Sequence, residues 1–190
     1  MRRTDLEHII RAAGDIADDD EVVIIGSQAI LAQYPDAPAG LLTSMEADLW
    51  PKNHPDRADV VDGCIGEGSA FHETYGYYAQ GVGPQTARLP PNWMKRLVAI
   101  RNANTRNVTG WCLEAHDLAL SKYVAGRHKD LEYTRTMVRS GLLERKTLLS
   151  RLRTMDLGAS HLRLVSGRME RDFAELAPES GRAGKRKPGR

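Results

Sequence analysis

A short run of β-branched residues that ends at a glycine constrains the fold of this chain more than any other segment. Residues 22–25 are Val-Val-Ile-Ile, and Gly26 follows them directly. Such a run, bounded by turn residues, is typical of a strand that is buried on both faces. Ser27 can then cap a helix that continues through Leu31. The sequence therefore predicts a strand, a Gly-Ser turn and a helix in succession.

A second strand is predicted over residues 45–50, after a loop at 35–40 in which Pro and Gly exclude regular structure. Glu46 and Asp48 are two positions apart on it, so their side chains should share one face. Two neighbouring carboxylates repel each other unless a cation lies between them, and Mg²⁺ or Mn²⁺ suits such oxygen ligands. The Gly-Ser turn offers N–H groups, a hydroxyl and the helix dipole to an anion. Together these features indicate metal-assisted chemistry on a nucleoside triphosphate.

The rest of the chain predicts an α+β fold in which a small mixed sheet is flanked by helices and followed by a helical region. Thr4 and Glu7 have capping-box spacing at the start of an amphipathic helix. Further helical pattern occurs over 55–75, where glycines interrupt it, and in four segments after Glu114. Additional strands are expected at 77–78, 97–100 and 111–113.

These patterns suggest three parts of the chain. Residues 1–113 are expected to form the α/β core, and residues 114–178 a helical region packed on it. Residues 179–190 form a polar basic tail without core residues, which we expect to be disordered.

Charge is unevenly distributed along the chain, although the formal net charge is only +2. Residues 1–90 contain 15 Asp and Glu against 6 Lys and Arg, whereas residues 91–190 contain 10 against 21. Such asymmetry favours a nucleic acid or another polyanion as a partner.

Composition excludes several classes of protein. Hydrophobic residues make up 41% and charged residues 27%, as in ordinary globular domains. No apolar run is long enough to span a membrane, and no apolar segment follows the basic N-terminus, so neither a membrane partner nor a secretory signal is expected. Two cysteines, Cys64 and Cys112, cannot form a disulfide framework and suit a reducing cytoplasm.

Residues 22–31 and 44–50 resemble the signature of the nucleotidyltransferase superfamily related to DNA polymerase β, in which a Gly-Ser turn precedes an acid-x-acid strand. The later sequence is similar to one branch, the AbiEii-like and MenT-like toxin nucleotidyltransferases and the related DUF6036 proteins. The residues that carry this second similarity are Tyr77-Tyr78, Gly81-Val82, Thr86, Leu89-Pro90, Trp93, Arg96-Leu97, Asp117-Leu118, Ser121-Lys122, Arg127 and Lys129-Asp130.

The resemblance implies that an NMP is transferred from an NTP to an acceptor hydroxyl with Mg²⁺ or Mn²⁺. It implies RNA as the acceptor, in particular a tRNA 3′ end, and a toxin that has an antitoxin partner. It assigns metal binding and catalysis to Glu46 and Asp48, catalysis also to Lys122 and Asp130, and nucleotide binding to Gly26, Ser27, Lys122 and Arg127.

Several alternatives remain open from the residues alone. Lys122 also has the pattern of a solvated helix lysine, and Asp130 that of a first-turn acid favoured by the helix dipole. The superfamily has a third metal-binding carboxylate on a later strand, but the strands expected here carry none, so it is absent or comes from Glu114 or Asp130. The acceptor could instead be a protein hydroxyl, or the chain could be a nucleic-acid-binding module with a degenerate site. Cys112 and His116 lack the further ligands that a zinc site needs.

Overall fold

The computed structural model describes residues 1–176, and the predicted basic tail at 179–190 lies outside this range. Five strands are present in this part: β1 (Glu21–Ile24), β2 (Glu46–Pro51), β3 (Tyr78–Gly81), β4 (Val98–Ile100) and β5 (Thr109–Cys112). The α-helices are α1 (Arg3–Ala17), α2 (Ala58–Ile65), α3 (Ala70–Tyr75), α4 (Ala115–Ala125), α5 (His128–Arg139), α6 (Arg145–Leu152) and α7 (Ala159–Leu176). Short 3₁₀ helices are η1 (Ser27–Ala32), η2 (Ala39–Leu41), η3 (Pro55–Arg57) and η4 (Trp93–Arg96).

The strands form one mixed sheet in the order β3-β2-β1-β5-β4, which confirms the predicted α+β class. β1 lies in the centre, antiparallel to β2 and parallel to β5. β2 is in turn parallel to the edge strand β3, with Asp48 opposite Gln80. The central place of β1 follows from its sequence, because Val22, Val23 and Ile24 are fully buried and need cover on both faces.

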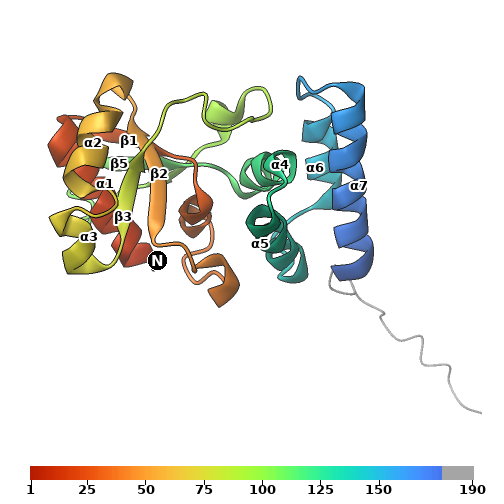
Figure 1. Cartoon of the computed structure of the whole chain (residues 1–190), viewed down its shortest axis with the longest axis horizontal. Coiled ribbons are helices and arrows are strands. Elements are labelled where there is room, and N and C mark those ends of the chain that lie inside the picture. The colour runs from red at the N-terminus through yellow and green to blue at the C-terminus, as the bar shows by residue number, and fades with distance from the viewer. Residues whose placement is uncertain (177–190) are drawn as a thin grey trace, which may run out of the picture.

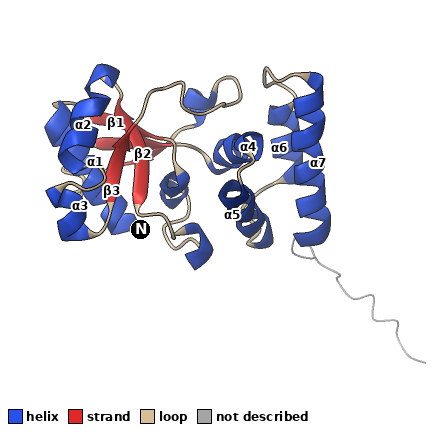
Figure 2. Ribbon diagram, in the orientation of Figure 1, coloured by secondary structure: helices blue, strands red, loops and turns tan. Residues whose placement is uncertain are grey.

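Helices α1, α2 and α3 lie on one side of the sheet, and α4 to α7 lie on the other (Figures 1 and 2). The 3₁₀ helix η1 connects these layers, since it contacts β2, β4 and β5 as well as α4. Four helices after Glu114 were predicted and are present. Among residues 1–176, no helix is both long and apolar enough to cross a membrane.

Two helix starts differ from the sequence predictions. Ser27 does not cap η1: Gly26 is the N-cap residue, and the Ser27 hydroxyl accepts a hydrogen bond from Lys122 instead. The predicted capping box at Thr4 and Glu7 is also wrong, because α1 begins at Arg3 and the Asp5 carboxylate accepts the Arg2 backbone N–H at 2.7 Å. A side chain remote in sequence engages Ser27, whereas at α1 the true start at Arg3 lies before the position that the local pattern indicated.

A buried ion cluster fixes the start of α4. Glu114 is the N-cap and accepts the backbone N–H groups of His116 and Asp117 at 3.2 and 3.4 Å. Asp117 is fully buried and accepts from Arg96 of η4 at 2.7 Å and from Arg151 of α6 at 2.8 Å. Arg151 also pairs with Glu114. The cluster therefore joins three segments that are remote in sequence and orients the helix that carries Lys122.

The charge on Glu114 is expected to stabilise the fold in a pH-dependent way. Burial alone would raise its pKa, but hydrogen bonds from His116 and Arg151 lower it to about 2, against 4.5 in the unfolded chain. A depressed pKa stabilises the folded state fully above pH 4.5, and this contribution is lost as the pH falls toward 2. The upper bound is roughly 3 kcal/mol. Chemical denaturation between pH 7 and pH 3 should therefore show Glu114→Gln less stable at pH 7, with the difference from wild type shrinking in acid.

The exposed Glu73→Gln is the matched control, and it should follow wild type throughout the pH range. A constant difference between wild type and Glu114→Gln from pH 7 to pH 3 would contradict the ionic origin of this stabilisation.

Candidate active site

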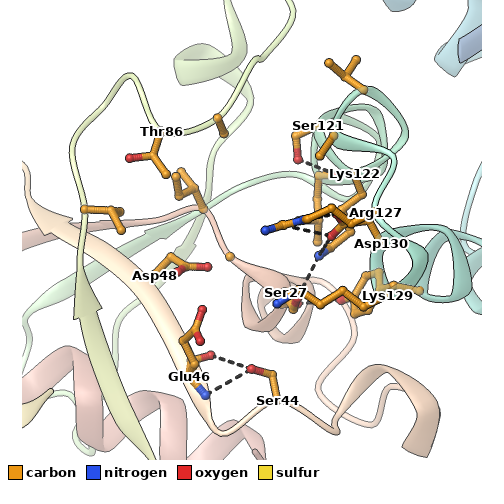
Figure 3. A pocket seen from close by; sticks show the side chains of 18 of the residues that line it. Ser27, Ser44, Glu46, Asp48, Thr86, Ser121, Lys122, Arg127, Lys129 and Asp130 are labelled. Carbon is orange, nitrogen blue, oxygen red and sulfur yellow. Dashed lines mark hydrogen bonds and ion pairs between the residues drawn. The ribbon is translucent and has the colours of Figure 1, made fainter. Parts of the chain in front are cut away.

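A cleft of about 790 Å³ lies between the sheet and helices α4 and α5. Figure 3 shows its two walls, with acidic side chains from β2 on one side and basic side chains from α4 and α5 on the other. The loop after β3 contributes Thr86 and Arg88 to the lining. Every residue that the sequence analysis assigned to nucleotide or metal binding lines this one cleft.

Glu46 and Asp48 form the acidic wall, on the same face of β2 as their spacing predicts. In the amide orientation that satisfies both groups, Gln80 Nε2 donates to Asp48 Oδ1 at 3.3 Å and to Glu46 Oε1 at 3.2 Å. The Tyr78 hydroxyl donates to Glu46 Oε2 at 3.2 Å. Burial, and then the neighbouring Glu46 carboxylate, raise the pKa of Asp48 to about 7. The cations of the cleft therefore do not fully neutralise the Glu46 and Asp48 carboxylates.

This acidic wall fits one hard divalent cation. Two carboxylates and the nearby amide are oxygen-bearing groups of the type that Mg²⁺ accepts, and water and substrate phosphate oxygens usually complete its shell. The raised pKa of Asp48 reflects like-charge repulsion and burial, which a cation between the carboxylates would offset. Glu46 and Asp48 would be the residues that hold it.

Gly26 lies directly beneath Asp48. A Cβ atom at this position would be 2.1 Å from Asp48 Oδ2 and 2.8 Å from Asp48 Cγ, so only glycine leaves room for the carboxylate. Within residues 1–176, the backbone N–H groups of Gly26, Ser27 and Gln28 donate to no protein acceptor. Gly26 and Ser27 line the cleft, so their N–H groups can donate to an anion there, whereas Gln28 is fully buried outside the lining. The predicted help from a helix dipole is not available, because η1 is a 3₁₀ helix of only six residues.

The basic wall is built around Lys122, which is no solvated helix lysine. Its side chain is 11% exposed, and burial lowers its pKa. Lys122 Nζ donates to Ser27 Oγ at 2.8 Å and lies 4.4 Å from the ring centroid of Tyr133. The Tyr133 hydroxyl in turn donates to the Ser27 carbonyl oxygen at 2.6 Å. Two helical side chains therefore hold the Gly-Ser turn.

Asp130 pairs with the cations of this wall. It is buried, and it accepts from Arg127 Nε at 2.6 Å and from Lys122 Nζ at 3.5 Å. Burial alone would raise the pKa of Asp130, but Arg127 and Lys122 hold it below its usual value. The Arg127 side chain remains 65% exposed and reaches into the cleft (Figure 3). In this arrangement Asp130 orients two positive groups toward the cleft.

Among residues 1–176, no third carboxylate joins Glu46 and Asp48. Glu114 is engaged at the start of α4, and Asp130 is engaged by Lys122 and Arg127. Within the described part of the chain, no cluster of three or more His, Cys, Asp or Glu could hold a metal ion. Cys112 is buried, and His116 Nδ1 lies 2.6 Å from Glu114 Oε1.

Gln80, Arg88 and Tyr133 are among the cleft residues that sequence reasoning did not assign to the site. Two of them had a detectable signal. Tyr133 is three positions after Asp130 and so lies on the same face of α5. Gln80 is two positions after Tyr78 in the candidate strand 77–80, and that spacing puts both side chains on one face. Arg88 lies in an irregular loop, where the sequence pattern carries no directional information.

Comparison with known families adds one finding to this geometry. A family model described as "Nucleotidyltransferase of unknown function (DUF6036)" matches residues 4–168. Searches of curated proteins and of solved structures found no match. The matched range contains every residue of the cleft named above.

Substitution of Gly26 should damage the cleft with little effect elsewhere. In Gly26→Ala the added methyl group collides with the Asp48 carboxylate, and overpacking of this kind costs about 1–3 kcal/mol. We expect a lower melting temperature and weaker binding of a fluorescent ATP analogue in the presence of Mg²⁺. Gly167→Ala in α7 is the control, because a Cβ there meets nothing within 4 Å. Equal nucleotide binding by both variants would contradict the role assigned to Gly26.

Proposed function

We propose a reaction for this chain, which belongs to the DUF6036 family of nucleotidyltransferases: it transfers an NMP from an NTP to an acceptor hydroxyl. The observation that carries this proposal is the opposition of two walls in one cleft, with Glu46 and Asp48 facing Lys122 and Arg127. A triphosphate needs positive charge around it, and an acidic pair needs a cation beside it. The cleft offers places for both.

Glu46 and Asp48 would hold the divalent cation. When bound, such an ion neutralises phosphate charge and stabilises the charge that develops during phosphoryl transfer. Tyr78 keeps Glu46 oriented: burial and the Glu46 carboxylate raise its pKa to about 12, so its hydroxyl stays protonated and donates.

The other wall would bind the triphosphate. Lys122 and Arg127 would pair with the β- and γ-phosphates, and the free N–H groups of Gly26 and Ser27 would donate to their oxygens. The α-phosphate would then lie near the acidic pair. An acceptor hydroxyl would attack the α-phosphorus, its proton would pass to water, and pyrophosphate would leave. Positioning and charge neutralisation would account for most of the rate.

The acceptor in this proposal is RNA, specifically a tRNA 3′ end, and the biological role is that of a toxin with an antitoxin partner. The excess of Lys and Arg after residue 90 supports a polyanionic acceptor. Arg127, His128 and Lys129 are exposed where α5 begins, and Arg127 and Lys129 line the mouth of the cleft. A polynucleotide could therefore approach along α5. The toxin role rests on the resemblance to AbiEii-like and MenT-like proteins.

A labelling assay tests the reaction. Protein, α-labelled NTPs, Mg²⁺ and total tRNA are incubated with candidate protein partners, and label on RNA is expected. Asp48→Asn and Lys122→Met should each lower the rate by at least about a hundredfold, since each removes charge that stabilises the transition state. Asp59→Asn on α2 is the control, because Asp59 is exposed and does not line the cleft.

The acceptors give different outcomes in this assay. Label on a protein would show that the acceptor is a protein hydroxyl and not RNA. No label on either, together with RNA binding that Asp48→Asn leaves unchanged, would favour a binding module with a degenerate site.

RNA binding should depend steeply on salt. If Lys129 contacts a phosphate, Lys129→Ala should reduce the slope of log K against log salt by about 1. Lys146→Ala on α6 is the control, because Lys146 is exposed outside the cleft. Filter binding of tRNA at several salt concentrations measures the slope for each variant. Equal slopes for Lys129→Ala and Lys146→Ala would contradict binding of RNA along α5.

A further inference from the structure

Gln80 is an uncharged polar residue that lies beside the acidic pair. It lies on β3 directly opposite Asp48 in the register of the sheet, and its side chain lines the cleft. Its amide reaches both carboxylates, at 3.3 Å from Asp48 and 3.2 Å from Glu46. No other residue in the described part of the chain hydrogen-bonds both acids at once.

A primary amide has two different ends, and each suits one state of this pair. Its NH₂ group donates to carboxylates and so satisfies them when no cation is near. Its carbonyl oxygen is a neutral ligand of the kind that Mg²⁺ accepts. A carboxylate in the same place would instead add a third negative charge, which strengthens cation binding and destabilises the site without a cation.

We propose that Gln80 is a positioning residue that keeps the acidic pair weakly binding toward a free divalent cation. The chain then takes up its cation chiefly together with the nucleotide, whose phosphate oxygens supply the missing negative ligands. This inference rests on the proposed function for the identity of the nucleotide. The cation affinity of the protein alone does not depend on that identity.

The experiment measures Mn²⁺ binding to the full chain without nucleotide, by isothermal titration calorimetry. Gln80→Glu keeps the length of the side chain and adds one charge. We expect it to bind Mn²⁺ at least about tenfold more tightly than wild type. Gln85→Glu is the matched control: it adds the same charge in the loop after β3, at an exposed residue that does not itself line the cleft, and should bind Mn²⁺ as wild type does. If Gln80→Glu does not fold, Gln80→Asp takes its place.

Thermal unfolding supplies a second readout. In EDTA the melting temperature of Gln80→Glu should fall below that of wild type, because three carboxylates then repel one another. Added Mn²⁺ should raise the melting temperature of Gln80→Glu by more than it raises the melting temperature of wild type. Equal Mn²⁺ affinities of Gln80→Glu and wild type would overturn the proposal, as would an equal Mn²⁺-dependent rise in melting temperature. The labelling assay is independent: tight Mn²⁺ binding by Gln80→Glu with no nucleotide transfer by wild type would refute the reaction and leave this inference standing.

Discussion

Repulsion between two carboxylates on one face of β2 determines much of what surrounds them. Glu46 and Asp48 cannot move apart, because alternate residues of a strand project to the same side. Neutral donors from β3 and the charges of Lys122 and Lys129 across the cleft offset only part of this repulsion, because the pKa of Asp48 stays raised. Gly26 has no side chain, and this leaves room for the Asp48 carboxylate.

The cations of the cleft are themselves held by buried acids. Asp130 pairs with Lys122 and Arg127, and Asp117 pairs with Arg96 and Arg151 at the start of the same helical region. Breaking such a buried pair leaves an uncompensated charge, which is strongly destabilising. The two clusters therefore keep α4 in a defined orientation, and Lys122 reaches the Gly-Ser turn 95 residues earlier in the chain. The shape of the cleft therefore depends on contacts between segments that are far apart in the sequence.

Local pattern was enough to find the elements that carry the site. The Val-Ile run predicted β1, and the spacing of Glu46 and Asp48 predicted their shared face. Local pattern failed where a distant group competes for a hydrogen bond: Ser27 was expected to cap a helix, but Lys122 engages its hydroxyl. Local pattern also gave no sign that Gln80 meets the acid pair, because that contact comes from the pairing of β3 with β2.

The sequence by itself determined the α+β class, the central buried strand, the acid pair and the glycine that precedes it. These follow from hydrophobic run length, side-chain alternation and turn preference, which act over a few residues. Only the tertiary structure decided that Gln80 of β3 meets the acid pair. It also decided that Lys122 contacts Ser27 and that Asp130 pairs with both Lys122 and Arg127. These contacts depend on strand order and helix packing, because the groups that meet are far apart in the sequence.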